Sequence, residues 1–442
     1  MFGKDARTDA MAEAVRLSHD PVELSICAPM RIPGLVHKAD RFFLASMTDL
    51  NAMVSAAKES DPDLVLVGPE DPLAAGIVDA LEALGIPCFG PTRELAQIET
   101  SKSFARSLLA KHSLAGNPAH RCFTSDVGLA AFIDSLGDVV VKPDGLTGGK
   151  GVKVMGEQLA GAGEALAYAR SCLLGDGRVV VEERLVGEEF SLMTLTDGDS
   201  VAHCPVAQDH KRAFEGDTGP NTGGMGSYSC ADHAMPFLAA SDLRFAEQLN
   251  EAVLGALAAE TGKPYRGVLY GGFMAVAGGA RLIEYNARFA DPEAMNVLPL
   301  LRGDFVGLAR AVATRRLGDV KVSFERQATV CKYVVPAAYP GPSNDDPVIE
   351  LDQHGPAGAT SGTPGLRHYW GAAEMGQDGK VRLTGSRGLA FVGIGDSLEE
   401  AEALAEAGAA GVRGTVRHRS DIGTARLVAE RVSHMRAVRG SA

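Results

Sequence analysis

From residue 22 to residue 92, short apolar runs alternate with stretches of helical periodicity, and this alternation constrains the fold more than any other feature of the chain. The apolar runs VELSICAP, LVLVGPE and IPCFGP are separated by predicted helices around 49–59 and 74–84. Strands that alternate with helices in this way form a parallel sheet. Two of the strands end in Gly-Pro turns, where ligands bind in open α/β sheets. Only Met1 and Phe2 precede the first glycine, so we expect the first strand of this sheet to be largely missing.

Beyond residue 99 the pattern changes to strands joined by glycine turns. The segments 139–154 and 178–195 are typical of antiparallel strands, and 270–289 predicts a hairpin about a Gly-Gly turn, which tolerates positive φ. A further unit begins near residue 327 and contains one amphipathic helix at 397–414. We therefore expect an α/β domain at 1–98, a second domain at 99–326, a third domain at 327–430 and a frayed tail at 431–442.

Composition excludes several classes of protein. No apolar run approaches the ~18 residues of a membrane span, and a net charge of −13 opposes attraction to nucleic-acid phosphates. Seven cysteines without a C-x-x-C pair argue against a disulfide framework or a zinc cage, so we expect buried thiols. The N-terminus lacks the layout of a secretory signal. We expect a cytoplasmic protein whose partners include neither membrane nor nucleic acid.

The segment DGLTGGKG (144–151) invites interpretation as a phosphate-binding loop, since consecutive glycines let backbone N–H groups approach anionic oxygens. It does not fit the Walker pattern, because Gly145 and Gly149 are one residue too close and Gly151 replaces the Ser or Thr that would hold magnesium. A tight hairpin turn explains the glycines equally well. Lys142 and Lys150 favour the phosphate hypothesis, because they place two ammonium groups where phosphates would lie.

The strand LIEYNARF (282–289) places three polar side chains on one face. Residues two apart in a strand share a face, so Glu284, Asn286 and Arg288 project together. A carboxylate and an amide oxygen are hard ligands that suit Mg²⁺, which takes one or two protein oxygens plus substrate phosphates. The alternative is a solvated strand face, continued by Asp291 and Glu293 as a polar loop.

The stretch AQDHKRAFEGDTGPNTGGMGSYS (207–229) shows neither helical nor strand periodicity. Charged runs are usually solvated, but a loop that closes over a ligand needs clustered glycines such as those at 223, 224 and 226. In VVVEERLVGEE (179–189) an apolar strand runs into four carboxylates, which magnesium or a ribose could use or which could simply be exposed.

Together these stretches resemble one family, the glycinamide ribonucleotide synthetases (phosphoribosylamine–glycine ligases) of the ATP-grasp superfamily. The resemblance rests on GPEDPLAAGIVDAL, FGPTRELAQIETSKSFA, VVKPDGLTGGKGV, QDHKRAFEGDTGPNTGGMGSYS, GVLYGGFM and IEYNARFADPEAMNVLPLL, in that order. It implies an α/β and α+β protein. The N-terminal domain would have a doubly wound parallel sheet, the central ATP-grasp domain a small mobile lobe at about 118–190, and the C-terminal domain would be β-rich.

The resemblance also implies an activity. ATP would phosphorylate the carboxylate of glycine, and the amine of 5-phosphoribosylamine would attack the acyl phosphate to give an amide, ADP and phosphate. The implied cofactors are ATP and Mg²⁺ or Mn²⁺, the partners are these small-molecule substrates, and the implied oligomeric state is a monomer.

Site residues follow from the resemblance position by position. The residues for the ATP phosphates and their lid are Lys102, Lys142, Gly148, Gly149 and Lys150. Glu182 and Leu185 would read the adenine edge, Glu188 or Glu189 would hold the ribose, and Glu284 and Asn286 would bind the metal. Arg288, Asp209 and Lys211 would be catalytic. The remaining substrate contacts would be Gly3, Arg7, Gly68, Pro69, Glu70, Asn221, Thr222 and Gly223.

The chain departs from the family most at its N-terminus. The family's glycine-rich loop, similar to G-x-G-G-R-E-H-A, cradles the phosphate of phosphoribosylamine, whereas this chain has GKDARTDA (3–10). Asp5 and Ala6 replace two glycines, which limits backbone approach. The carboxylates of Asp5 and Asp9 would repel a dianionic phosphate unless Lys4 and Arg7 compensate. Ala290 in place of the family's usual glycine is a mild change.

Three hypotheses follow. The chain is the family's ligase with an unusual loop, or a paralogue that couples its activated carboxylate to another amine. The third is a protein that binds ATP without catalysis, which the presence of Lys102, Lys142, Glu284 and Asn286 opposes. Another ligase on the same fold, such as a biotin carboxylase, is opposed by the 208–226 motif.

Overall fold

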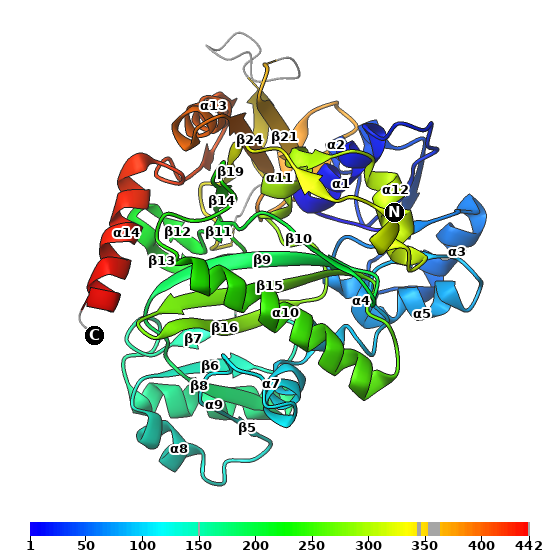
Figure 1. Ribbon diagram of the computed structural model, residues 1–442. Helices are drawn as coiled ribbons and strands as arrows, with labels where there is room; N and C mark the ends of the chain where they lie inside the picture. Colours follow the sequence, from blue (N-terminus) through cyan, green and yellow to red (C-terminus); the bar gives the residue numbers. More distant parts are fainter. Residues whose placement is uncertain (149–150, 343–345, 352–362, 441–442) are drawn as a thin grey trace.

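The computed structural model describes residues 1–148, 151–342, 346–351 and 363–440. The N-terminal region, blue in Figure 1, contains parallel strands. Strand β1 (Ser25–Ala28) pairs with β2 (Arg41–Leu44), and β3 (Val65–Leu66) pairs with β4 (Cys88–Phe89). The connecting helices are α1 (Ala6–Arg16), α2 (Pro33–Lys38), α3 (Leu50–Ser60), α4 (Glu70–Ala75) and α5 (Ile77–Glu82).

The first strand, expected to be largely missing, is reduced to one residue that pairs on both sides. Phe2 forms parallel bridges to Cys27 and to Val67. The N–H of Phe2 donates to the carbonyl of Leu66 at 3.0 Å, and that of Gly3 donates to the carbonyl of Cys27 at 3.1 Å. Phe2 therefore joins the two strand pairs into one parallel sheet, as the predicted doubly wound domain requires.

The next region contains a small antiparallel sheet with its own core, at the bottom of Figure 1. Helices α6 (Gln97–Thr100) and α7 (Lys102–Lys111) lead into it. Its strand order is β5 (His120–Phe123), β8 (Val179–Glu183), β6 (Val139–Pro143) and β7 (Lys153–Val154). Helices α8 (Leu129–Leu136) and α9 (Ala162–Asp176) supply apolar side chains to a hydrophobic core separate from that of the rest of the molecule.

The large antiparallel sheet of the central domain has the order β10 (Val201–His203), β9 (Glu188–Thr196), β15 (Gly267–Val276) and β16 (Gly279–Asn286). Strands β15 and β16 form the predicted hairpin, in which Glu284 lies opposite Gly272 and Asn286 opposite Tyr270. Helix α10 (Ala240–Thr261) crosses this sheet (Figure 1). The chain then passes through α11 (Ala294–Val297), β17 (Leu301–Arg302), α12 (Phe305–Ala313) and β18 (Ser323–Phe324).

The C-terminal region is β-rich, as expected. Its larger sheet contains β11 (Gln208–Asp209), β14 (Gly226–Ser229), β19 (Ala328–Pro336), β24 (Leu389–Gly395) and β21 (Leu366–Trp370), with β26 (Val416–Arg417) beside β19. Helix α13 (Leu398–Ala410) packs on β24 and β19. The smaller sheet contains β22 (Ala373–Met375), β23 (Val381–Leu383), β20 (Val348–Leu351) and β25 (Val412–Arg413).

The 207–229 stretch differs from the expectation that it lacks strand structure. Its ends pair as β11 and β14, and β12 (Arg212–Phe214) pairs with β13 (Thr218–Asn221). Glycines with positive φ, such as Gly224 at 110°, interrupt the alternation of side chains that would have indicated strands. The stretch is therefore anchored at both ends in the C-terminal sheet.

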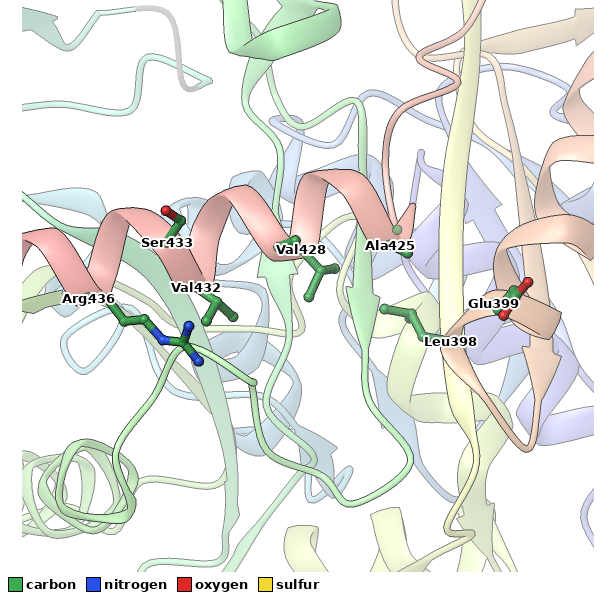
Figure 2. A pocket seen from close by; sticks show the side chains of 9 residues that line it. Leu398, Glu399, Ala425, Val428, Val432, Ser433 and Arg436 are labelled. Carbon is green, nitrogen blue, oxygen red and sulfur yellow. The ribbon is translucent and has the colours of Figure 1, made fainter.

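The C-terminus also differs from the expected frayed tail. Helix α14 (Ala425–Gly440), red in Figure 1, buries Leu427 and Met435. Leu398, Val428 and Val432 line a groove of about 520 Å³ between α14 and the start of α13 (Figure 2). In the part of the chain that the structure describes, no helix is both long and apolar enough to cross a membrane.

Candidate active site

A cleft of about 1130 Å³ lies where the three regions meet. The N-terminal region contributes Glu70, the small sheet contributes Lys142, the large sheet contributes Glu284, and the C-terminal region contributes Arg387. Predicted site residues that line it are Arg7, Glu70, Lys102, Lys142, Gly148, Glu182, Leu185, Glu189, Asp209, Lys211, Asn221, Thr222, Gly223, Glu284, Asn286 and Arg288. Gly3, Gly68 and Pro69 do not line it, and Gly149 and Lys150 lie outside the described residues.

A buried ion cluster joins the small sheet to helix α7. Arg106 donates to both carboxylate oxygens of Glu182, at 2.6 and 2.9 Å, and the Lys142 ammonium lies 2.7 Å from the same carboxylate. Burial disfavours ionisation of Glu182, but the two cations overcome it and lower its pKa to about 2. The Glu182 carboxylate is therefore held by two cations from neighbouring segments. Sequence reasoning missed Arg106, although its position one helical turn after Lys102 is a usable signal.

The predicted metal ligands lie among cations. Burial opposes ionisation of Glu284, but Lys211, Lys142 and Lys102 together lower its pKa, so the carboxylate is charged. The side-chain oxygen of Asn286 accepts a hydrogen bond from Arg288 at 3.4 Å. Within the described ranges no three His, Cys, Asp or Glu side chains gather as a metal cage. One carboxylate and one amide oxygen fit Mg²⁺ that also takes phosphate oxygens as ligands.

Arg288 connects the large sheet to the N-terminal region. Its guanidinium lies 2.7 Å from the Glu99 carboxylate and 3.3 Å from that of Glu70. Burial raises the pKa of Glu99 to about 7, because Arg288 offsets the loss of solvent only in part and Glu70 adds repulsion. Sequence reasoning did not single out Glu99. The arginine is thus shared between two acids from separate segments.

The N-terminal loop is ordered by its own charged side chains. Asp5 caps helix α1 by accepting from the N–H of Thr8 at 3.0 Å. Burial opposes ionisation of Asp5, but Arg7 lowers its pKa to about 2, and Arg7 also donates to the carbonyl of Phe289 at 2.6 Å. Arg7 is therefore committed to protein groups. Lys4, which pairs with Asp71, is the loop cation that reaches solvent, with a side chain 35% exposed.

Asp9, the other carboxylate expected to repel a phosphate, points away from the cleft. It is fully buried, lies 2.7 Å from the Lys38 ammonium and accepts from the N–H of Trp370 at 2.8 Å. Gly3 and Gly68 leave room for the Thr8 side chain. A Cβ would lie 2.0 Å from that side chain at Gly3 and 2.6 Å from it at Gly68, which is too close for either position to carry one. Asp9 therefore joins the N-terminal region to β21.

The 209–224 loop presents both cations and acids to the cleft, among them Lys211 and Asp209. The Lys211 ammonium lies 2.7 Å from the Glu189 carboxylate. Burial and the neighbouring Glu293 raise the pKa of Asp209 well above its ordinary value, and its buried Oδ1 has no hydrogen-bond partner. Thr222 accepts from the N–H of Gly224 at 3.1 Å, which holds the glycines in place.

Arg387 holds this loop from the C-terminal region. It donates to the carbonyls of Gly223 at 2.7 Å and Asp291 at 2.9 Å, and its guanidinium lies 3.1 Å from the Asp291 carboxylate. It also lies 4.9 Å from the centre of the Tyr333 ring. Sequence reasoning missed it, because nothing in GSRG (385–388) distinguishes this arginine from an exposed one.

Comparison with family models matches three successive segments. They are the N domain (1–99), the ATP-grasp (A) domain (100–294) and the C domain (329–425) of phosphoribosylglycinamide synthetase. The phosphoribosylamine–glycine ligase of Methanosarcina acetivorans is 44% identical over 442 residues, which cover 100% of this chain and 97% of the relative. That of Methanocaldococcus jannaschii is 44% identical over 450 residues, covering 99% of each chain.

Solved structures share the fold. The phosphoribosylamine–glycine ligase from Thermotoga maritima has a TM-score of 0.77 and 24% identity, with 95% of this chain and 98% of that chain covered. A biotin carboxylase domain from Hydrogenobacter thermophilus has a TM-score of 0.69 and 13% identity, with 98% and 92% covered. The predicted three-domain ATP-grasp fold is thus confirmed, and the matched family segments span most of the sequence. The chain belongs to the phosphoribosylglycinamide synthetase family.

Proposed function

We propose that the cleft joins glycine to 5-phosphoribosylamine through a glycyl phosphate, giving glycinamide ribonucleotide, ADP and phosphate. Membership of the family makes the chain an ATP-dependent carboxylate–amine ligase of purine biosynthesis. The observation that carries the assignment to this cleft is that Glu284 lines it together with Lys102, Lys142 and Lys211, which lower the pKa of its carboxyl group against the effect of burial. That arrangement suits a nucleotide triphosphate whose charge is divided between a divalent cation and ammonium groups.

In the nucleotide half, Lys102 and Lys142 would meet the ATP phosphates, beside the loop that includes Gly148. Glu189 would hold the ribose, because its partner Lys211 and its own carboxylate both line the cleft. Glu182 and Leu185 would read the adenine edge through their main-chain groups, while the Glu182 carboxylate stays paired with Arg106 and Lys142. Glu284 and Asn286 would hold Mg²⁺, or Mn²⁺ in its place, which supplies charge neutralisation for phosphoryl transfer.

In the glycine half, Arg288 and Lys211 would orient the carboxylate for attack on the γ-phosphate and offset the charge that develops. The main-chain groups of Asn221, Thr222 and Gly223 would enclose the acyl phosphate and exclude water. Asp209 would lie close to the ammonium group of glycine. Its raised pKa reflects burial, and a cationic ligand would favour its ionised form.

In the amine half, the phosphate of phosphoribosylamine would meet Lys4, the solvent-reaching cation of the N-terminal loop. Arg7 would act by holding Asp5 and Glu70 rather than by direct contact. The amine would then face the acyl phosphate from the N-terminal side of the cleft. Positioning supplies much of the rate, because the acyl phosphate is already reactive.

The test is ADP release with glycine and freshly generated phosphoribosylamine, beside reactions that contain other amines. We expect turnover that requires both substrates and a divalent cation. Intact ATP binding without turnover would contradict the assignment of the amine. We also propose that the protein is cytoplasmic and monomeric. Light scattering of the purified chain would measure its molar mass and so test the monomeric state.

A further inference from the structure

Helix α14 lies outside the matched family segments and yet reaches the cleft. The C-domain match ends at residue 425, where α14 begins. The helix leaves the C-terminal region and packs on β9 and β15 of the large sheet. Two of its side chains, Arg431 and His434, line the cleft. Neither residue stood out in the sequence as part of a site.

The two side chains meet a buried carboxylate on β9. Glu188 is 4% exposed, its Oε1 lies 2.6 Å from His434 Nδ1, and its Oε2 lies 3.4 Å from Arg431 Nε. Both contacts reach Glu188 from α14. Gln208 adds an amide N–H at 3.4 Å. Because neighbouring strand residues face opposite ways, Glu188 turns to α14 while Glu189 turns to Lys211.

Arg431 also reaches the 209–224 loop, where it pairs with Asp217. The same carboxylate lies 2.7 Å from Arg419 and 3.6 Å from His210, the neighbour of Asp209 and Lys211. A single guanidinium thus touches the strand proposed to hold the ribose and the loop proposed to enclose glycine. A forked, planar cation can bridge two carboxylates in this way.

We propose that Arg431 and His434 are positioning residues that set β9 and the 209–224 loop in one mutual arrangement. This inference rests on the proposed function, which assigns the nucleotide to Glu189 and glycine to the loop. Without the guanidinium, Glu188 keeps the His434 imidazole but loses its arginine, and Asp217 keeps Arg419 but loses Arg431. Both segments then gain freedom, so nucleotide affinity and turnover fall together.

Arg439 provides a matched control on the same helix. It lies 2.7 Å from Asp242, a carboxylate whose side chain is 1% exposed, and its own side chain is 26% exposed against 19% for Arg431. Arg439→Ala therefore also leaves a buried acid without its arginine and loosens α14, but it does so away from the cleft.

The experiment compares Arg431→Ala with Arg439→Ala in the full chain, by calorimetric titration with ADP and by steady-state kinetics. Loss of this restraint on β9 and the loop predicts about a tenfold weaker ADP affinity and a lower kcat for Arg431→Ala. For Arg439→Ala we expect ADP affinity and kcat near those of the unmodified chain, even where thermal stability falls. Equal losses in both variants, or unchanged ADP affinity in Arg431→Ala, would overturn the proposal.

Two further arms complete the design. If Arg431→Ala does not fold, Arg431→Lys keeps the charge, loses the fork and should show a smaller loss of the same kind. In a double-mutant cycle with Asp217→Ala, the double variant should bind ADP only slightly more weakly than Arg431→Ala does. Additive losses of ADP affinity would contradict coupling between Arg431 and the loop. ADP titration also separates this proposal from the proposed ligase activity. It measures the effect of Arg431 on nucleotide binding even if glycine and phosphoribosylamine give no turnover.

Discussion

Replacing Glu182 by glutamine tests the buried ion cluster between α7 and the small sheet. The carboxylate meets Arg106 at 2.6 Å and Lys142 at 2.7 Å, and all three side chains are buried. Its pKa falls from an ordinary 4.5 to about 2 in the folded protein. At about 1.4 kcal/mol per pKa unit, ionisation of Glu182 contributes about 3 kcal/mol to the free energy of unfolding near neutral pH.

The sign of the pH dependence follows from the lowered pKa. A carboxyl group whose pKa is lower in the folded protein than in the unfolded chain stabilises the folded state fully at pH values above the unfolded-state pKa. For Glu182 this stabilisation is lost as pH falls from about 4.5 toward about 2. Glu182→Gln should therefore lower the free energy of unfolding by about 3 kcal/mol or more. The loss should be similar at pH 7 and at pH 5, since both values lie above the unfolded pKa. Urea denaturation at the two pH values, followed by circular dichroism, measures this loss.

Glu183→Gln is the matched control, because Glu183 is the next residue of β8 and pairs with Arg281 at 2.6 Å with a side chain 32% exposed. A pair this exposed is worth about 1 kcal/mol at most. A loss of unfolding free energy in Glu182→Gln no larger than that in Glu183→Gln would contradict a stabilising buried cluster. A loss in Glu182→Gln that becomes substantially smaller between pH 7 and pH 5 would contradict the lowered pKa of Glu182.

Three other perturbations address the cleft. Glu284→Gln removes the ionised oxygen proposed as a metal ligand and should lower Mg²⁺-dependent turnover by about a hundredfold or more. Undiminished turnover would contradict the proposal that Glu284 binds the metal. Arg387→Ala frees the carbonyl of Gly223 and takes the guanidinium away from the Asp291 carboxylate, so the KM for glycine should rise about tenfold with ADP affinity unchanged. Burial raises the pKa of Glu99 to about 7, so its stabilising contribution is complete below about 4.5 and lost as pH rises through 7. The melting temperature of the unmodified chain should therefore fall relative to that of Glu99→Gln between pH 5 and pH 8, and a constant difference would contradict the raised pKa.

Local patterns in the sequence predicted the parts of the site that lie on single segments. Glu284, Asn286 and Arg288 follow from strand alternation, and all three line the cleft. The glycine clusters at 144–151 and 223–226 indicated where backbone would approach ligands. The fold class followed from the alternation of strands and helices together with the family resemblance.

The missed residues belong to contacts between distant segments. Arg387 and Gly223 are 164 residues apart, and Arg106 and Glu182 are 76 apart, so no local period relates them. Helix α14 looked like a frayed tail because its cations resemble a solvated face. In the structure Arg431 and Arg439 meet acids on other segments instead. Pairing of this kind depends on tertiary structure rather than on sequence spacing.

The path of α14 across β9 has a consequence for biosynthesis of the chain. His434 lies 246 residues after Glu188, the carboxylate that it contacts. At about 5–20 residues per second, the ribosome adds that stretch in roughly ten to fifty seconds. During this interval the domains made first can fold, but Glu188 and Asp217 still lack Arg431. A nascent chain therefore completes its cleft only when helix α14 has emerged.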